Sequence, residues 1–238
     1  MSKNYPFPLY HGTSSIFLSS ILETGLGGKN IIKELKVQDL AKEMFPFVIE
    51  NFGKNKPFFK TTCEIESFKR MAQNIESDIF QYGDIYVTAC LSHAYGYATS
   101  SPWGSELLSY VFLFFDRLMA INVKECETWK KKYPEIFNFK NTKGTPLILS
   151  LSGVKFSDLL TERGDEISED EINETFKSKT AGGLSEDIRK QLGRFRLKHT
   201  VDKSNLKIYI PVTVNSHPND RFDLIELDPS SLSFKYLP

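Results

Sequence analysis

The chain has 238 residues, which is enough for one sizeable α/β domain or for two small ones. Nineteen Phe and ten Tyr, with 40% hydrophobic and 25% charged residues, are typical of a folded globular protein and exclude a disordered tail or a fibre. Thirty basic residues balance thirty acidic ones, which excludes a chain-wide field that would attract nucleic acid or a membrane.

The three cysteines, Cys63, Cys90 and Cys126, are odd in number and lack the spacing of metal ligands. We therefore expect reduced thiols, a cytoplasmic location and no bound metal. The apolar run at residues 110–115 is far too short to span a membrane, and residues 1–10 lack the apolar stretch of a signal peptide. The sequence thus predicts a soluble protein without a membrane partner.

At the start of the chain, the prolines of residues 6–10 predict a short extended segment that ends at His11. Ser14 or Ser15 then begins a helix, because either residue is a good N-cap, and Gly25 ends it. This order predicts a strand, a tight turn and a helix.

Helical spacing follows in much of residues 29–82, which we interpret as a helical insertion in a single domain of residues 1–238. Residues 84–88 predict a strand, and residues 92–99 a short helix. The apolar stripe of residues 104–121 predicts a buried helix, although 110–115 alone would also fit a strand.

Three strands are expected in the second half of the chain. Residues 145–152 and 206–214 are rich in β-branched and aliphatic side chains, and Pro211 suggests an edge or a bulge in the second. A last strand spans 222–227. Periodicity alone supports either an α/β or an α+β fold.

The first block with chemical promise is Leu9-Tyr-His-Gly-Thr-Ser14, in which a strand delivers an imidazole and then a glycine. The missing side chain of Gly12 would let a flat ligand lie against the backbone, whose N–H and C=O groups suit a carboxamide. On its own, the His-Gly pair is a weak signal and is more typical of a histidine whose hydrogen bonds are satisfied at a strand end.

The second block runs from Gly83 to Tyr97. Tyr86 ends a strand, and Tyr97 follows eleven residues later on a helix, so both rings can line one cleft. Two such rings would stack on a nicotinamide ring and stabilise its positive charge by about 1 kcal/mol or more. Two core tyrosines are the alternative.

These blocks resemble the poly(ADP-ribose)-polymerase-like branch of the ADP-ribosyltransferase superfamily. That branch has a strand ending in His-Gly-Ser/Thr, a helix closing in Gly-Leu, and a Gly-x-x-Tyr strand with a second tyrosine eleven residues later. The resemblance implies that NAD⁺ is the substrate, that His11 bonds the adenosine ribose and that the Gly12 backbone clamps the nicotinamide amide. It also implies that Tyr86 and Tyr97 flank the nicotinamide ring.

The resemblance further implies an α+β fold with a split, mainly antiparallel sheet around the NAD⁺ cleft. Thr13 completes the first motif and joins the NAD⁺-binding set. Where the family often has a serine on the nicotinamide amide, this chain has Ala94. Ser92 is the candidate that could supply the missing contact.

The third block, Arg221 to Leu237, resembles the last strand of the same family, where a glutamate begins a motif ending in Lys-Tyr-Leu. Placed without gaps on that ending, the glutamate falls on Asp223. Glu226 is the second candidate, on the opposite face of the strand. A carboxylate there would stabilise the oxocarbenium-like sugar and orient the acceptor. A simple strand-end carboxylate is the alternative.

A basic cluster occupies about twenty residues and consists of Arg189, Lys190, Arg194, Arg196, Lys198, His199, Lys203 and Lys207. With Phe195 among them, these residues would suit a surface that tracks the phosphates of a nucleic acid. A solvated face that balances the acidic residues before it is the alternative.

Together these observations predict an enzyme that transfers ADP-ribose from NAD⁺ to a protein or a nucleic acid and releases nicotinamide. By analogy a stand-alone transferase of this size is a bacterial toxin or defence effector, and the analogy leaves room for a neutralising partner protein. A non-catalytic NAD- or ADP-ribose-binding module and an NAD-consuming enzyme with a small acceptor, such as a glycohydrolase, remain open.

Overall fold

The computed structural model describes residues 3–53, 59–73, 84–142, 144–170, 172, 193–213 and 222–228. The chain divides into two compact units. The sheet unit comprises Met1–Lys29, Asp84–Gly104 and Gly144–Pro238, and the helical unit comprises Asn30–Gly83 and Ser105–Lys143. The helical unit thus includes residues 30–82 of the expected insertion and a second segment with residues 105–121 of the apolar stripe.

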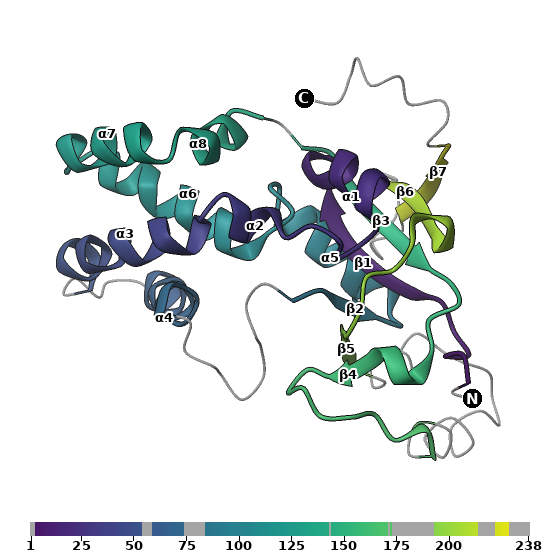
Figure 1. Ribbon diagram of the computed structural model, residues 1–238. Coiled ribbons are helices and arrows are strands. Elements are labelled where there is room, and N and C mark those ends of the chain that lie inside the picture. Colours follow the sequence, from purple (N-terminus) through teal and green to yellow (C-terminus); the bar gives the residue numbers. More distant parts are fainter. Residues whose placement is uncertain are drawn as a thin grey trace. The chain divides into compact units, whose positions relative to one another are not determined.

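The sheet unit is built on seven antiparallel strands in the order β4-β5-β2-β1-β3-β6-β7 (Figure 1). The α+β class and the antiparallel sheet expected from the sequence are confirmed. The strands are β1 (Leu9–Ser14), β2 (Tyr86–Thr88), β3 (Pro146–Leu151), β4 (Leu159–Thr161), β5 (Arg194–Leu197), β6 (Leu206–Thr213) and β7 (Phe222–Leu227).

β1 is the central strand, and its two neighbours pair with it very differently. With β3 it stays in register over six residue pairs, from Leu9↔Leu151 to Ser14↔Pro146. With β2 it shares the single registered pair Tyr10↔Thr88. The expectation that the strand ends at His11 is therefore wrong, because the pairing with β3 carries it to Ser14.

One face of the sheet holds the larger core. Leu147, Leu149 and Leu151 alternate along β3 and are at most 2% exposed, as inward-facing strand residues should be. They cluster with Leu18 and Ile21 of α1 (Leu18–Thr24), which follows the 3₁₀ turn η1 (Ser15–Phe17). α1 ends at Gly25, whose φ of 83° suits a glycine and confirms the predicted helix stop.

α5 (Leu91–Ser100) covers the opposite face. Ala94 and Ala98, one helical turn apart, pack against Ile148 of β3. Because these side chains are small, the helix backbone comes very close to β1. A Cβ atom built on Gly12 would overlap the carbonyl oxygen of Ala94 and lie 2.8 Å from the backbone nitrogen of Ala98. Only glycine fits at this position of β1.

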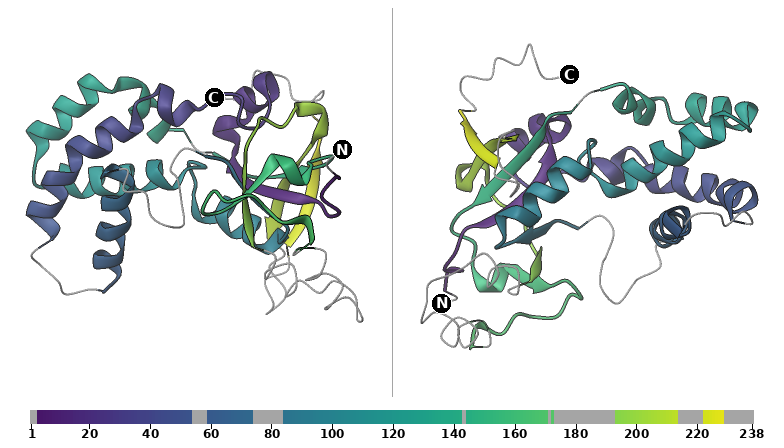
Figure 2. Two further views of the ribbon diagram at one scale, coloured as in Figure 1. Left: turned by 60° about the horizontal axis from the view of Figure 1, so that its bottom comes forward. Right: turned by 180° about the vertical axis from the view of Figure 1, so that it is seen from behind.

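The helical unit contains six α-helices in the part of the chain that is described (Figure 2). α6 is its centre, since Leu108, Phe112 and Phe114 are fully buried and the helix packs on α3 and α4. The prediction of a buried helix here is confirmed. The helices are α2 (Ile31–Glu34), α3 (Val37–Phe52), α4 (Phe59–Gln73), α6 (Glu106–Met119), α7 (Val123–Lys132) and α8 (Pro134–Lys140).

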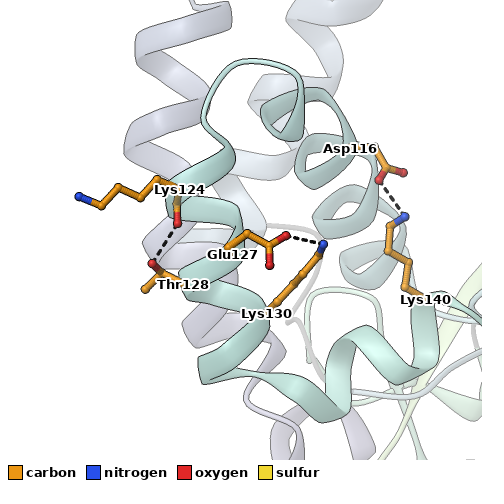
Figure 3. A network of polar contacts seen from close by, with 6 residues as sticks. All are labelled: Asp116, Lys124, Glu127, Thr128, Lys130 and Lys140. Carbon is orange, nitrogen blue, oxygen red and sulfur yellow. Dashed lines mark hydrogen bonds and ion pairs between the residues drawn. The ribbon is translucent and has the colours of Figure 1, made fainter.

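Ion pairs lie at the surface of the last two of these helices (Figure 3). Lys140 of α8 forms a 2.7 Å ion pair with Asp116 of α6. Lys130 and Glu127 form another within α7, also at 2.7 Å. Exposed pairs of this kind contribute about 0–1 kcal/mol each, so the apolar contacts of α6 dominate the stability of the unit.

We predict that Gly12→Ala lowers the free energy of unfolding by at least about 2 kcal/mol, because α5 must move away from β1. Gly96→Ala is the matched control. Gly96 lies inside α5, and a Cβ there meets nothing within 4 Å, so alanine should stabilise the helix by about 1 kcal/mol. Urea unfolding of both variants measures the difference, and a wild-type midpoint for Gly12→Ala would contradict the packing argument.

Candidate functional site

His11 occupies the place where β1 and β2 part. Its Nδ1 lies 2.8 Å from the backbone carbonyl oxygen of Tyr86, which begins β2 and does not end a strand as expected. Burial lowers the pKa of His11 below its ordinary value, and the bond to the Tyr86 carbonyl opposes this only in part. A carbonyl oxygen only accepts hydrogen bonds, so Nδ1 carries the proton of the neutral ring. Nε2 is then an acceptor, suited to a ligand hydroxyl.

Gly12 and Thr13 follow on β1, and the structure changes the reason for the glycine. The side on which a Cβ would stand is filled by the backbone of α5, so its absence serves packing and leaves no space there for a flat ligand. Only the backbone N–H and C=O groups of Gly12 can form hydrogen bonds with a carboxamide. Thr13 is 2% exposed, so its side chain reaches a ligand only if its neighbours move.

The two tyrosines come from β2 and α5, which both lie beside β1. Tyr97 is 41% exposed, and its hydroxyl oxygen accepts a 2.7 Å hydrogen bond from Nη1 of Arg194. Tyr86 is half-buried and lies opposite Arg196 on β5. The sheet unit therefore brings His11 and both tyrosines to neighbouring elements around the start of β2.

Two further candidates from the same helix differ in how accessible they are. Ala94 is buried against Gly12, so it offers a ligand no polar contact. Ser92 is half-buried, and its hydroxyl oxygen lies 3.1 Å from the sulfur of Cys90. This contact occupies the group that was expected to replace the missing serine.

β5 contributes Arg194 and Arg196, which the sequence places in the basic cluster that was expected to contact a nucleic acid. Arg194 and Arg196 alternate with buried Phe195, and they face Thr88 and Tyr86 across the β2–β5 pairing. The guanidinium of Arg194 also pairs with Glu162, which follows β4. Glu162 had no motif to single it out, and its position emerges only from the pairing of β4 with β5.

Three cations of the basic cluster are neutralised by ion pairs. Arg196 pairs with Asp84 at 2.9 Å, and Lys198 pairs with Glu166 at 3.1 Å. With the Arg194–Glu162 pair, each of these cations has a carboxylate partner. This arrangement favours a balanced, solvated face over a surface that tracks phosphates. Arg189 lies outside the described residues.

Asp223 and Glu226 lie on β7, away from the other candidates. The continuous register of β6 and β7 confirms that the two carboxylates are on opposite faces of the strand. Glu226 forms a 3.3 Å ion pair with Lys207. β3 and β6 separate β7 from β1, a lateral distance of about 14 Å for three strand spacings. The structure does not bring either carboxylate together with His11, Tyr86 or Tyr97.

The lowered pKa of His11 predicts a pH-dependent stability. The unfolded chain, with the ordinary histidine pKa of 6.5, binds a proton that the folded chain does not. The contribution of the neutral His11 ring to the free energy of unfolding is therefore complete above about pH 6.5. It declines as the pH falls toward the lowered pKa of the folded state. We expect the urea midpoint to drop less between about pH 7.5 and 5.5 in His11→Gln than in the wild type. His199→Gln, at an exposed histidine, is the control, and equal drops in all three proteins would contradict the prediction.

Other kinds of site are not evident in the described residues. No three His, Cys, Asp or Glu side chains gather there as metal ligands would. None of the helices whose positions are described is long and apolar enough to cross a membrane. Comparison of the chain with protein-family models, with curated proteins and with solved structures found no match.

Proposed function

We propose that the protein uses NAD⁺ as an ADP-ribosyl donor and transfers ADP-ribose to a macromolecule with release of nicotinamide. The observation that carries this proposal is the contact between two of the motifs. His11 of the first block bonds the backbone of Tyr86 of the second block at 2.8 Å. Gly12, next to His11, packs against the helix that holds Tyr97. Residues more than seventy positions apart thus form one cluster at the junction of β1 and β2, with His11 on one face of the sheet and α5 on the other.

Each member of the cluster suits one part of NAD⁺. The neutral His11 offers Nε2 as an acceptor for a ribose hydroxyl. The Gly12 peptide has the donor and acceptor that a carboxamide needs. The rings of Tyr86 and Tyr97 suit the positively charged nicotinamide, by stacking and by cation–π contact.

In the proposed reaction the glycosidic bond between nicotinamide and ribose breaks and nicotinamide leaves with the bonding electrons. The resulting oxocarbenium-like sugar is attacked by an acceptor nucleophile, which loses its proton. A carboxylate would stabilise the positive sugar and receive that proton. By resemblance this carboxylate is Asp223, with Glu226 as the second candidate. Their distance from β1 argues against direct contact with a ligand held at His11.

That distance favours one competing function, a module that binds NAD⁺ or ADP-ribose without turnover.

The free thiols of Cys63, Cys90 and Cys126 fit the proposed cytoplasmic location. For the acceptor, a protein agrees better with the neutralised surface of β5 than a nucleic acid does. The proposal of a toxin or defence effector, with a neutralising partner, continues to rest on analogy.

NAD⁺ should raise the melting temperature of the protein, because it binds only the folded state. We predict that His11→Ala and Tyr97→Ala each reduce this shift by at least half and leave the unliganded protein folded. Nicotinamide release and labelling of cell extract by radioactive NAD⁺ distinguish the candidate functions. Release with labelling supports the transferase, binding without release supports the module, and release without labelling supports a glycohydrolase. Full shifts in both variants would place the NAD⁺ site elsewhere.

The role of β7 can be tested with shape-conserving substitutions. Because β7 lies three strands from β1, we predict that Asp223→Asn and Glu226→Gln each change nicotinamide release by less than about threefold. A transition-state carboxylate would lose on the order of 10² to 10³ in rate. A loss of that size in Asp223→Asn alone would assign it the carboxylate role that the resemblance implies and would require β7 to approach the ligand.

A further inference from the structure

Arg194 connects a carboxylate to the exposed tyrosine of the candidate site. Its Nη1 donates to the Tyr97 hydroxyl oxygen at 2.7 Å, and its Nε pairs with the Glu162 carboxylate. The side chains of Arg194 and Glu162 are 35% and 20% exposed, so water screens their charges only in part. Three elements, α5, β5 and the turn after β4, therefore meet in one chain of polar contacts.

Backbone pairing fixes this chain of contacts. β4 holds Glu162 beside β5 through the pair Thr161↔Phe195, and β5 holds Arg194 opposite Thr88 of β2. Gly164, in the turn that follows Glu162, has φ of 96° and lies against the guanidinium of Arg196. The turn thus packs closely on β5. The pairing of β4 with β5 therefore fixes the backbone position of Glu162.

The charges of the Arg194–Glu162 pair matter because the Tyr97 ring is proposed to contact the nicotinamide ring of the ligand. In NAD⁺ the nicotinamide ring is a cation, and in NADH the same ring is neutral. A lone arginine on the Tyr97 hydroxyl would repel the cationic ring and leave the neutral one unaffected. Glu162 supplies the opposite charge at the same place, so the pair as a whole is close to neutral.

We propose that Glu162 is a specificity-determining residue: by neutralising Arg194 it allows the Tyr97 surface to accept a positively charged pyridinium ring. The inference rests on the proposed function, since it takes Tyr97 as the place of the nicotinamide. It adds that recognition of the oxidised dinucleotide depends on a carboxylate that no motif contains. Arg194 acts as a positioning residue that ties this carboxylate to the ring.

The test compares the dissociation constants of NAD⁺ and NADH, whose ratio cancels general damage to the fold. Glu162→Gln removes the carboxylate charge that pairs with Arg194, so the ratio of the NAD⁺ constant to the NADH constant should rise, by roughly five- to tenfold. Arg194→Gln leaves the carboxylate uncompensated, so the ratio should fall below the wild-type value. The double variant, with both charges removed, should return to within about twofold of the wild type.

Glu166→Gln is the matched control, because Glu166 lies in the same turn region and pairs with Lys198 instead. Its ratio should equal that of the wild type. Equal ratios in all variants, or shifts of both single variants in the same direction, would overturn the proposal. If Glu162→Gln does not fold, the fall in Arg194→Gln decides alone. A wild-type protein that binds neither dinucleotide would instead refute the proposed function, so the two failures are distinguishable.

Discussion

The close approach of α5 to β1 at Gly12 is the constraint on which the geometry of the candidate site depends. A helix that packs on a sheet is normally separated from it by the side chains of both elements. Here a glycine and two alanines remove that spacer, and the backbone of Ala94 rests on β1. The position of Tyr97, next to Ala98 on the same helix, is therefore set by backbone contact rather than by adaptable side chains.

The same constraint organises both faces of the sheet. Since β1 presents Gly12 to α5, its neighbours His11 and Thr13 point toward the other face, where α1 and the leucines of β3 form the larger core. The imidazole thus sits at the margin of an apolar environment, which accounts for its lowered pKa. Helix packing on one face and histidine chemistry on the other follow from a single alternation along β1.

The elements that the sequence predicts well carry strong local signals. The apolar stripe of α6, the aliphatic run of β3 and the glycine that ends α1 each gave a clear local prediction, and each prediction is confirmed. β4 and β5 are only three and four residues long and polar in part. Their pairing with each other and with β2 is non-local, so no spacing rule predicts it.

The residues of the candidate site also divide into those that local motifs predict and those that only the folded chain brings together. His11, Gly12, Tyr86 and Tyr97 could be proposed from short motifs, because the members of each motif lie within fifteen residues of one another in the chain. The packing of α5 on Gly12 could not be predicted from a short motif, because Ala94 lies more than eighty positions away in the chain. Arg194 and Glu162 come from strands joined only in the folded chain. Asp223 was placed by matching the end of a motif, which assumes a strand order that a sequence does not contain.

The route of the chain through the two units bears on how the site forms. The segment 84–104, which carries both tyrosines, is joined at each end to the helical unit. Without those helices, β2 and α5 would have to find β1 across two long flexible loops, at a cost in loop-closure entropy. Helices rich in local contacts form quickly and shorten both loops before the strands meet. We therefore expect the helical unit to act, in the kinetics of folding, as a tether that raises the effective concentration of the tyrosine segment near its strand.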